Sequence, residues 1–259
     1  MTESVSFGRA ADYYDRTRAV PDEVMARLVP ELTTRLPAAE ACLEVGVGTG
    51  RIAIPLVEAG VRIVGVDISA EMLGKLRAKR AGAWPQLAIA DATRLPFRDA
   101  TFGSAIVSHV LHLVPAWRRA VAEMVRVVRP GGVLAASRGG GGEGWHHAVR
   151  RHFFVEAGDP SWPPGMDDIK ELDIEMEKIG AQTIPFPEML SEDSSSIDEL
   201  LEACEAGIWA ACWSLDEATR RRAAAATRKW AAQEFGDPQA RRPTVNGSVW
   251  RTYRLAQQR

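Results

Sequence analysis

Three glycines stand close together at positions 46, 48 and 50, inside the stretch CLEVGVGTGRIAIPL of residues 42–56. An apolar run precedes them and a helix-like pattern follows. Glycines between a strand and a helix let the backbone turn tightly and approach a ligand closely, and the first amides of the helix face that ligand. The stretch therefore predicts a nucleotide-binding loop, and the question is which nucleotide it holds.

Two common phosphate-binding loops differ from this pattern. The dinucleotide fingerprint is G-x-G-x-x-G, whereas the spacing here is G-x-G-x-G, and the G-K-[ST] of an ATP-binding loop does not follow the glycines. Asp67, at the end of the next expected strand, fits a nicotinamide nucleotide and other nucleosides equally well. A carboxylate at that place accepts hydrogen bonds from the ribose hydroxyls of any of them.

Glu44 discriminates better than Asp67 between these nucleotides, because it lies two residues before the first glycine. A carboxylate there would sit beside the diphosphate of a dinucleotide, and like charges at close range cost several kcal/mol, about 4 at 4 Å with an effective dielectric near 20. The ligand group near Glu44 is therefore expected to be positively charged. A nucleoside with a cationic tail is S-adenosyl-L-methionine (SAM), which carries both a sulfonium and an ammonium.

Short apolar runs alternate with segments of helical period between residues 40 and 137. The expected strands are 41–45, 62–66, 86–90, 104–108 and 133–137, and the expected helices are 51–59, 70–80 and 115–128. Near-continuous apolar runs such as IVGV are typical of a parallel sheet covered on both faces. The pattern predicts an α/β, Rossmann-like, doubly wound and mostly parallel seven-stranded sheet with helices on both faces. The glycine loop then lies where such sheets bind ligands.

The character of the chain changes after residue 137. A helix over 166–179 and strands over 181–186 and 248–256 are expected, and capping boxes at Ser196/Glu199 and Ser214/Glu217 predict two further helices. We expect one domain with a core of 38–137, 166–188 and 247–257. Residues 1–30, 139–165 and 189–246 are expected to form a helical cap or lid, the last of these all helical. Pro55 should kink or shorten its helix.

The composition of the chain limits the kinds of partner that it is expected to bind. The chain has 259 residues, 46% of them hydrophobic, and a net charge of −2, so no global positive field attracts nucleic acid or an anionic membrane. The first residues lack a signal-peptide core and no apolar run reaches 18 residues. We expect a cytoplasmic monomer or homodimer that does not insert into membranes.

Five motifs follow one another in the order and spacing of a known family. They are LEVGVGTG, VGVDISAEML, ADATRLPF, SAIVSHVLHLVP and RVVRPGGVL, and they run through most of residues 38–137. On these motifs the sequence resembles the class I SAM-dependent methyltransferases, specifically the type 11 group that includes the ubiquinone- and menaquinone-biosynthesis enzymes. The resemblance implies SAM as cofactor, S-adenosyl-L-homocysteine (SAH) as product and a small organic molecule as methyl acceptor.

The resemblance also implies roles for particular residues. Glu44 and the backbone of Gly46 and Gly48 would hold the methionine end, and Asp67 the ribose hydroxyls. Around the adenine, the implied residues are Ile68, Met72, Asp91 and the Ala92 amide. Ser108 and His109 would line the methyl-transfer side. The segment FGRAADYYDRTRAVP resembles the lid of the group, in which Tyr14 would close over the cofactor and Arg18 would meet its carboxylate. Alternatives remain: Met72 as plain helix core, and Asp91 as a turn residue before Thr93.

Methyl transfer from a sulfonium needs little from the protein beyond alignment of the acceptor and exclusion of water. An acceptor that must lose a proton also needs a base. His109 and His112, at and just after the end of the expected strand 104–108, are the candidates, with a hydrogen-bonded structural role as the alternative. HHAVRRH lacks metal-ligand spacing, so no metal is expected.

Two functions from different classes remain at this point. One is a SAM-dependent methyltransferase acting on the O, N or C atom of a small molecule. The other is a SAM-binding protein without transferase activity, acting as a sensor or partner subunit. Both need the glycine loop, Glu44, Asp67 and Asp91, and they differ in whether a pocket for an acceptor reaches the sulfonium.

Overall fold

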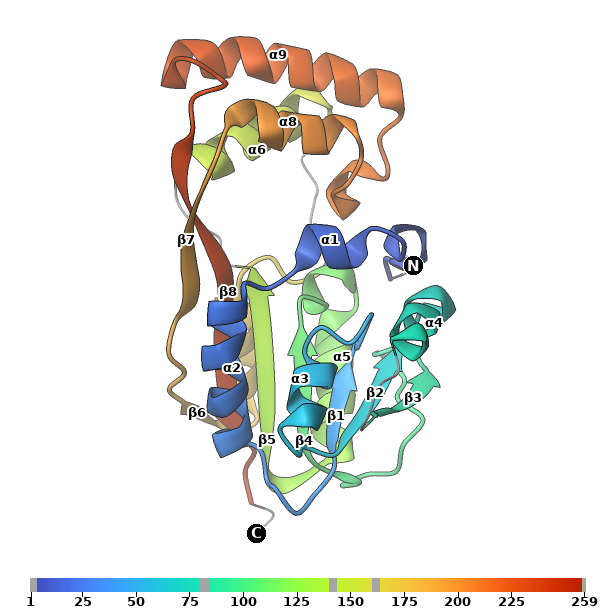
Figure 1. Cartoon of the computed structure of the whole chain (residues 1–259). Coiled ribbons are helices and arrows are strands. Elements are labelled where there is room, and N and C mark those ends of the chain that lie inside the picture. The colour runs from blue at the N-terminus through green and yellow to red at the C-terminus, as the bar shows by residue number, and fades with distance from the viewer. Residues whose placement is uncertain (1–3, 80–83, 140–143, 160–163, 258–259) are drawn as a thin grey trace. The chain divides into compact units, whose positions relative to one another are not determined.

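A computed structural model describes residues 4–79, 84–139, 144–159 and 164–257 (Figure 1). The chain divides into two compact units. Unit 1 consists of residues 1–138, 164–189 and 248–259, and unit 2 of residues 139–163 and 190–247. These boundaries fall close to those expected for the core and for two of the three cap segments, but the N-terminal segment belongs to unit 1. That 139–165 and 189–246 cover the site stays a prediction.

The strands form one mixed sheet, with eight strands in the described residues and the order β3-β2-β1-β4-β5-β8-β6; β7 pairs with β8. The first five are β1 (Cys42–Val45), β2 (Ile63–Asp67), β3 (Gln86–Ile89), β4 (Phe102–Ser108) and β5 (Val128–Gly139). Their pairs are parallel, with Cys42 opposite both Ile63 and Ser104. The order reverses between β1 and β4, so the carboxyl ends of these two strands flank the crevice where such sheets bind ligands.

Alternating side chains of the buried strands pack into two separate cores, one on each face of the sheet. Leu43 and Val45 of β1 contribute to the core that also contains buried residues of α5 (Trp117–Val127) and α7 (Ile169–Lys178). Cys42 contributes to the other core, with α2 (Asp22–Arg35), α3 (Ala53–Glu58) and α4 (Ala70–Ala78). Glu44 alternates with Leu43 and Val45, so it points to the second face. The expected α/β fold class is confirmed.

Unit 2 is held by its own core. Buried side chains of α6 (Trp145–Glu156), α8 (Ile197–Glu205) and α9 (Glu217–Phe235) meet there, and alanines at 223, 224 and 231 let α9 approach its neighbours closely. The remaining elements are the helix α1 (Tyr14–Arg18), the 3-10 helices η1 (Gly8–Ala10), η2 (Leu111–Leu113) and η3 (Ala210–Cys212), and the strands β6 (Gln182–Ile184), β7 (Met189–Ser195) and β8 (Arg242–Arg254). No helix within the described ranges is long and apolar enough to cross a bilayer.

Two local expectations were wrong, and one about Pro55 was confirmed. Residues 189–246 are not all helical, because β7 occupies the serine-rich stretch and β8 begins at Arg242; this adds an eighth strand to the seven expected. The helix expected from Ser214 starts at Glu217 instead, since Asp216 is the N-cap and accepts a hydrogen bond from the Thr219 amide. The helix after the glycine loop is shorter than the expected 51–59, as the position of Pro55 predicted. It covers Ala53–Glu58, so Pro55 falls in its first turn, where a proline is tolerated.

Candidate functional site

The glycine loop leaves β1 and turns back over the end of β2. Gly46, Gly48 and Gly50 have φ angles of 72°, 54° and 84°, a region that side chains disfavour. A Cβ atom at Gly46 would lie 2.2 Å from Cγ2 of Val110. The Gly46 and Val47 amides donate to the Val66 carbonyl at 2.8 and 3.0 Å. The loop is therefore held close to β2, with a shape that requires glycine at 46.

Asp67 connects the end of β2 to this loop. Its Oδ2 accepts a hydrogen bond from the Gly48 amide at 2.9 Å, and its Oδ1 accepts one from the Ser69 amide at 2.8 Å. Burial raises the pKa of this carboxyl above its ordinary value, although the backbone hydrogen bonds oppose the shift. Each oxygen keeps a second lone pair, so the carboxylate can still accept hydrogen bonds from hydroxyl groups.

A pocket of about 670 Å³ opens at the carboxyl ends of β1, β2 and β4, and part of this space is open to solvent. This volume lies within the range of about 300–1,000 Å³ that is typical of small-molecule sites. Its wall contains most of the site residues expected from the sequence: Tyr14, Gly46, Gly48, Asp67, Ile68, Met72, Asp91, Ala92, Ser108 and His109. Arg18, Glu44 and His112 lie outside that wall.

The wall also contains residues that the sequence analysis did not select. Ser4, Val5 and Phe7 come from the N-terminal segment, and Val110, Leu113 and Val114 from the stretch after β4. Phe7 meets Tyr14 edge to face, with ring centroids 5.8 Å apart. Phe7 and the three residues after β4 lie in segments that resemble the family, whereas Ser4 and Val5 precede them. Their apolar character could have drawn attention to them, because pockets for small molecules are lined mainly by such side chains.

Glu44 lies behind the glycine loop, in the middle of the parallel part of the sheet. Its neighbours across the strands are Gly65 and Ile106, and the residue is only 3% exposed. Its Oε2 is buried and has no hydrogen-bond partner among the described residues. Burial raises the pKa of Glu44 to about 8, which the positive charge of Arg51 opposes and the charge of Asp67 reinforces. An unsatisfied buried carboxyl oxygen is costly, and a cationic partner would relieve that cost.

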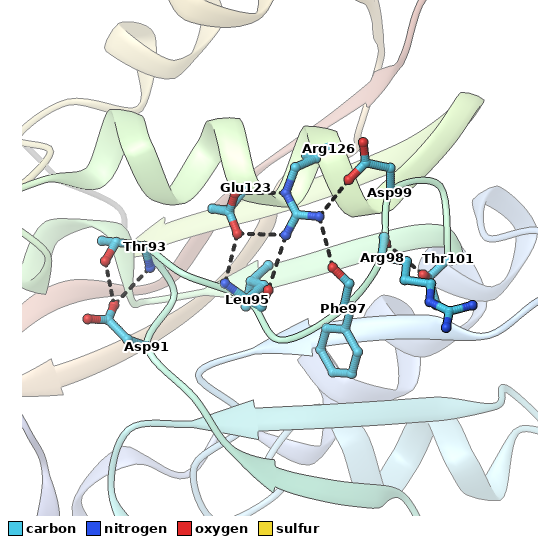
Figure 2. Close-up of polar contacts among 9 residues, drawn as sticks. All are labelled: Asp91, Thr93, Leu95, Phe97, Arg98, Asp99, Thr101, Glu123 and Arg126. Atoms are coloured by element: carbon cyan, nitrogen blue, oxygen red, sulfur yellow. Dashed lines mark hydrogen bonds and ion pairs between the residues drawn. The ribbon is translucent and has the colours of Figure 1, made fainter.

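Asp91 follows β3 and is exposed at the rim of the pocket. Its Oδ1 accepts hydrogen bonds from the amide and hydroxyl of Thr93 at 2.8 and 2.9 Å, so it forms the turn that was considered as an alternative (Figure 2). The turn uses only one carboxylate oxygen. Structural and ligand-binding roles of Asp91 are therefore compatible.

Arg126 of α5 fixes the loop that begins at this turn, as Figure 2 shows. Its guanidinium donates to the carbonyls of Leu95 and Phe97 at 3.1 and 2.8 Å, and it also pairs with the Glu123 carboxylate. The same Glu123 accepts a hydrogen bond from the Leu95 amide at 2.8 Å. Three of these contacts go to main-chain groups, so they hold this part of the loop independently of its side chains.

Ser108 is the last residue of β4, and His109 directly follows it. The Ser108 hydroxyl lies 2.8 Å from that of Ser137 on β5, and His109 Nε2 lies 2.6 Å from the Ser248 hydroxyl. His109 has a φ of 57°, which is uncommon for a side chain of this size and marks a tightly constrained position. Burial lowers the pKa of its imidazole well below 6.5, and the nearby cations Arg51, His112, Arg18 and Arg138 lower it further. His109 is therefore neutral near pH 7.

The N-terminal segment is joined to the glycine loop and α4 by charged contacts. Asp15 lies 2.6 Å from the Thr49 hydroxyl and 2.7 Å from Nζ of Lys79, and Asp12 pairs with Lys75 at 2.5 Å. Lys79 also donates to the Thr49 carbonyl at 2.8 Å. These contacts hold Tyr14 in the pocket wall. In the portion of the chain that is described, no group of three or more His, Cys, Asp or Glu could hold a metal ion.

Comparison with known proteins agrees with this geometry. Residues 43–136 match a family described as a methyltransferase domain. An uncharacterised methyltransferase of Mycobacterium bovis is 39% identical over 135 residues, which are 51% of each chain. A demethylmenaquinone methyltransferase of Streptomyces avermitilis is 35% identical over 131 residues, 49% of this chain and 55% of that protein. The chain thus spans about half the length of the curated relatives that it matches.

Solved structures extend the likeness of the fold beyond the matched segment. A SAM-dependent methyltransferase of Thermotoga maritima has a TM-score of 0.54 and 18% identity, with 97% of this chain and 98% of that chain covered. A sequence identity this low supports similarity of the fold only. Taken with the family match and the glycine loop, it leads to one conclusion. Residues 43–136 match the methyltransferase-domain family, and the chain shares its fold with a SAM-dependent methyltransferase.

Proposed function

We propose that the protein is a SAM-dependent methyltransferase that transfers a methyl group to a small organic molecule. The observation that carries the proposal is the buried Glu44, whose Oε2 lacks a partner in the described chain next to a pocket at the sheet's switch point. A ligand with a cationic tail would let this carboxyl ionise and pair with it, whereas the anionic diphosphate of a dinucleotide would leave it without a partner. The relatives named as methyltransferases support the same conclusion.

The residues around the pocket fit this cofactor. Asp67 would accept hydrogen bonds from the ribose hydroxyls, using the lone pairs that its backbone contacts leave available. Ile68 is 42% exposed and Met72 also contributes to the wall, so together they would pack on the adenine. Asp91 and the Ala92 amide would meet the polar edge of the base. Tyr14 would cover the bound ligand from the N-terminal side.

When bound, SAM supplies an activated methyl group on a sulfonium that is itself the leaving group. The protein then has to align the acceptor and exclude water, which in favourable systems accounts for about 7–11 kcal/mol of the barrier. Ser108 and His109 would form the acceptor side. His109 is neutral near pH 7, so it can orient an acceptor hydroxyl or amine, but its low pKa makes it a weak base. We therefore propose acceptor positioning as its main role.

His112 is a poorer candidate for a direct part in the reaction. It belongs to η2 and lies outside the pocket wall, and its backbone carbonyl accepts a hydrogen bond from the Gly165 amide at 3.0 Å. Its contribution would be electrostatic, through its effect on the pKa of His109.

The three cysteines are free thiols, which suits a reducing compartment such as the cytoplasm. A net charge of −2 gives no general attraction for nucleic acid. We propose a cytoplasmic monomer or homodimer.

Calorimetric titration with SAH and, separately, with NAD tests the cofactor assignment. We expect SAH to bind and NAD not to bind; tight binding of NAD without binding of SAH would overturn the proposal. Transfer is tested by incubating the protein with cell extract and methyl-labelled SAM. A labelled product that has gained one methyl group in place of a hydrogen is expected. Binding of SAH without any labelled product in extracts from several sources would instead favour a sensor or partner subunit.

A further inference from the structure

Ser248 holds the imidazole of His109 from outside the pocket. His109 lines the pocket wall, whereas Ser248, on β8, does not. The Ser248 hydroxyl lies 2.6 Å from Nε2 of His109, and the His109 amide donates to the Ser137 carbonyl of β5 at 3.0 Å. The strands β5 and β8 are neighbours in the sheet. The ring is therefore anchored at one of its two nitrogens by a residue that does not itself line the pocket.

The other ring nitrogen of His109, Nδ1, is left for a ligand. It makes no hydrogen bond to any residue that the structure describes. Nor is it one of the buried side-chain atoms that lack a partner in the described chain, so it keeps contact with solvent. In a neutral imidazole one nitrogen carries the proton and donates, while the other accepts. The role of Nδ1 toward a ligand is therefore decided by the role of Nε2 toward Ser248.

Two observations favour the Ser248 hydroxyl as the donor in this pair. An N–H donor normally lies about 2.7–3.2 Å from an oxygen, whereas a hydroxyl donor reaches about 2.5–3.0 Å from its acceptor, and 2.6 Å fits only the second range. In addition, the Ser248 hydroxyl forms no other hydrogen bond within the described chain. Donation to Nε2 satisfies the hydroxyl proton inside the protein and leaves the open donor, Nδ1–H, on a residue of the pocket wall.

His109 is poorly suited to take up a second proton. Burial lowers the pKa of its imidazole well below 6.5, and the charges of Arg51 and His112 lower it further. The ring therefore stays neutral at pH 7. Its single proton is then on the nitrogen that Ser248 does not occupy.

We propose that Ser248 is a positioning residue, whose hydroxyl donates to Nε2 of His109 so that Nδ1–H of His109 donates to an ionised oxygen of the methyl acceptor. The statement about the acceptor rests on the proposed function, whereas the tautomer of His109 does not. An amine nitrogen has one lone pair, which methyl transfer itself requires, so it cannot also accept the hydrogen bond from Nδ1–H. A phenolate or enolate oxygen has further lone pairs and can do both.

An acceptor of this class also removes the need for a base. A hydrogen bond to the ionised form of a hydroxyl lowers its pKa, and the positive charge of Arg51, which acts on His109, works in the same direction. The proton of the hydroxyl goes to solvent on ionisation. Transfer then breaks the bond between the methyl carbon and the sulfonium sulfur. The new bond joins that carbon to the phenolate or enolate oxygen, or to the carbon conjugated with it.

NMR of the full chain with isotope-labelled histidine measures the tautomer directly, because protonated and unprotonated ring nitrogens differ in chemical shift. The chain has five histidines, and the signals of His109 are those missing from His109→Gln. At pH 7 without ligand, we expect the proton on Nδ1 of His109. A proton on Nε2 in the wild-type protein would overturn the inference, whatever the variants show.

Ser248→Ala should release this preference, so that the Nε2–H form becomes populated, whereas Ser248→Thr keeps the hydroxyl and should keep the Nδ1–H form. Ser214→Ala is the matched control, because Ser214 lies outside the pocket wall and also loses one side-chain hydrogen bond, to Asp159 within unit 2. An unchanged tautomer in Ser248→Ala would overturn the positioning role. If Ser248→Ala does not unfold cooperatively, Ser248→Cys, whose thiol is a weak donor, takes its place.

The acceptor is tested with cell extract and methyl-labelled SAM. Ser248→Ala should lower the rate of label transfer by about tenfold and Ser248→Thr by less than about threefold, while both keep the affinity for SAH within about twofold. The methyl group of the purified product should lie on the oxygen of a phenol or enol, or on the carbon conjugated with it; an N-methylated product would overturn the assignment of the acceptor. A protein that neither binds SAH nor transfers label would refute the proposed function instead, and the spectrum of His109 would still decide its tautomer.

Discussion

Replacing Glu44 by glutamine should change how the stability of the ligand-free protein depends on pH. Burial raises the pKa of Glu44 from 4.5 to about 8. The folded state therefore holds this carboxyl protonated, while the unfolded chain ionises it above pH 4.5. A raised pKa of this kind contributes stability that is fully present below pH 4.5 and is lost as the pH rises toward 8.

The size of the effect follows from the two pKa values, with about 1.36 kcal/mol for each unit. Relative to strongly acidic solution, Glu44 costs the folded state about 1 kcal/mol at pH 5 and about 3 kcal/mol at pH 7. Wild-type protein should therefore lose about 2 kcal/mol of unfolding free energy over this interval because of Glu44. Glu44→Gln, which cannot ionise, should lack this loss.

The assay is unfolding of both proteins by urea at pH 5, 6, 7 and 8 without ligand. The quantity of interest is the difference between wild type and variant at each pH, because the other titrating groups cancel in it. This difference should shift in favour of Glu44→Gln as the pH rises. A difference that stays constant from pH 5 to 8 would refute the buried, protonated state of Glu44.

Ligand binding provides a second measurement of the same group. If Glu44 pairs with the ammonium of SAH, it must ionise on binding, so close to one proton should be released at pH 7. Titrations in two buffers of different ionisation enthalpy measure this proton. Wild-type protein should show a buffer-dependent enthalpy, and Glu44→Gln should not. Equal buffer dependence in both proteins would show that another group releases the proton.

Four further outcomes are expected. Asp67→Ala should weaken the binding of SAH by about tenfold or more, because charge-assisted hydrogen bonds worth about 1.5–3 kcal/mol are lost. Calorimetric titration of the variant measures this change. Asp15→Asn should increase the dissociation rate of SAH in stopped-flow fluorescence, because the N-terminal segment loses its charged contact with Lys79, and an unchanged rate would contradict that role. His109→Ala should lower turnover at every pH between 6 and 8 by a similar factor, since the imidazole of His109 is already neutral there; a loss confined to one side of that interval would indicate a titrating base. Arg126→Met should weaken the binding of SAH by about 0.5–2 kcal/mol, although Arg126 is not part of the pocket wall. The reason is that the loop after Asp91 loses the hydrogen bonds from Arg126 to its main chain; wild-type affinity in the variant would contradict this.

Features that depend on a local pattern of residues could be predicted from the chain. Near-continuous apolar runs identified the five parallel strands, and the helix starting at Ser196 followed from its capping box. The G-x-G-x-G spacing located the loop, where positive φ angles and the close approach of Val110 explain why glycine is present. Asp67 could be selected because a strand end is readable from the chain. Each of these depends on interactions between residues close in sequence or on the periodicity of one element.

Which charged groups pair and which stay unpaired depends on the packing of segments that are distant in the chain. The hydrogen bond between His109 and Ser248 joins residues 139 apart, and the contact of Asp15 with Thr49 joins residues 34 apart. The strand β7 forms in a serine-rich stretch because β8 extends far enough to pair with it. Glu44 could be chosen from the sequence, but its burial, its unpartnered oxygen and the nearness of Arg51 could not. Burial and charge proximity depend on how distant segments pack together, and neither leaves a pattern in the residues nearby.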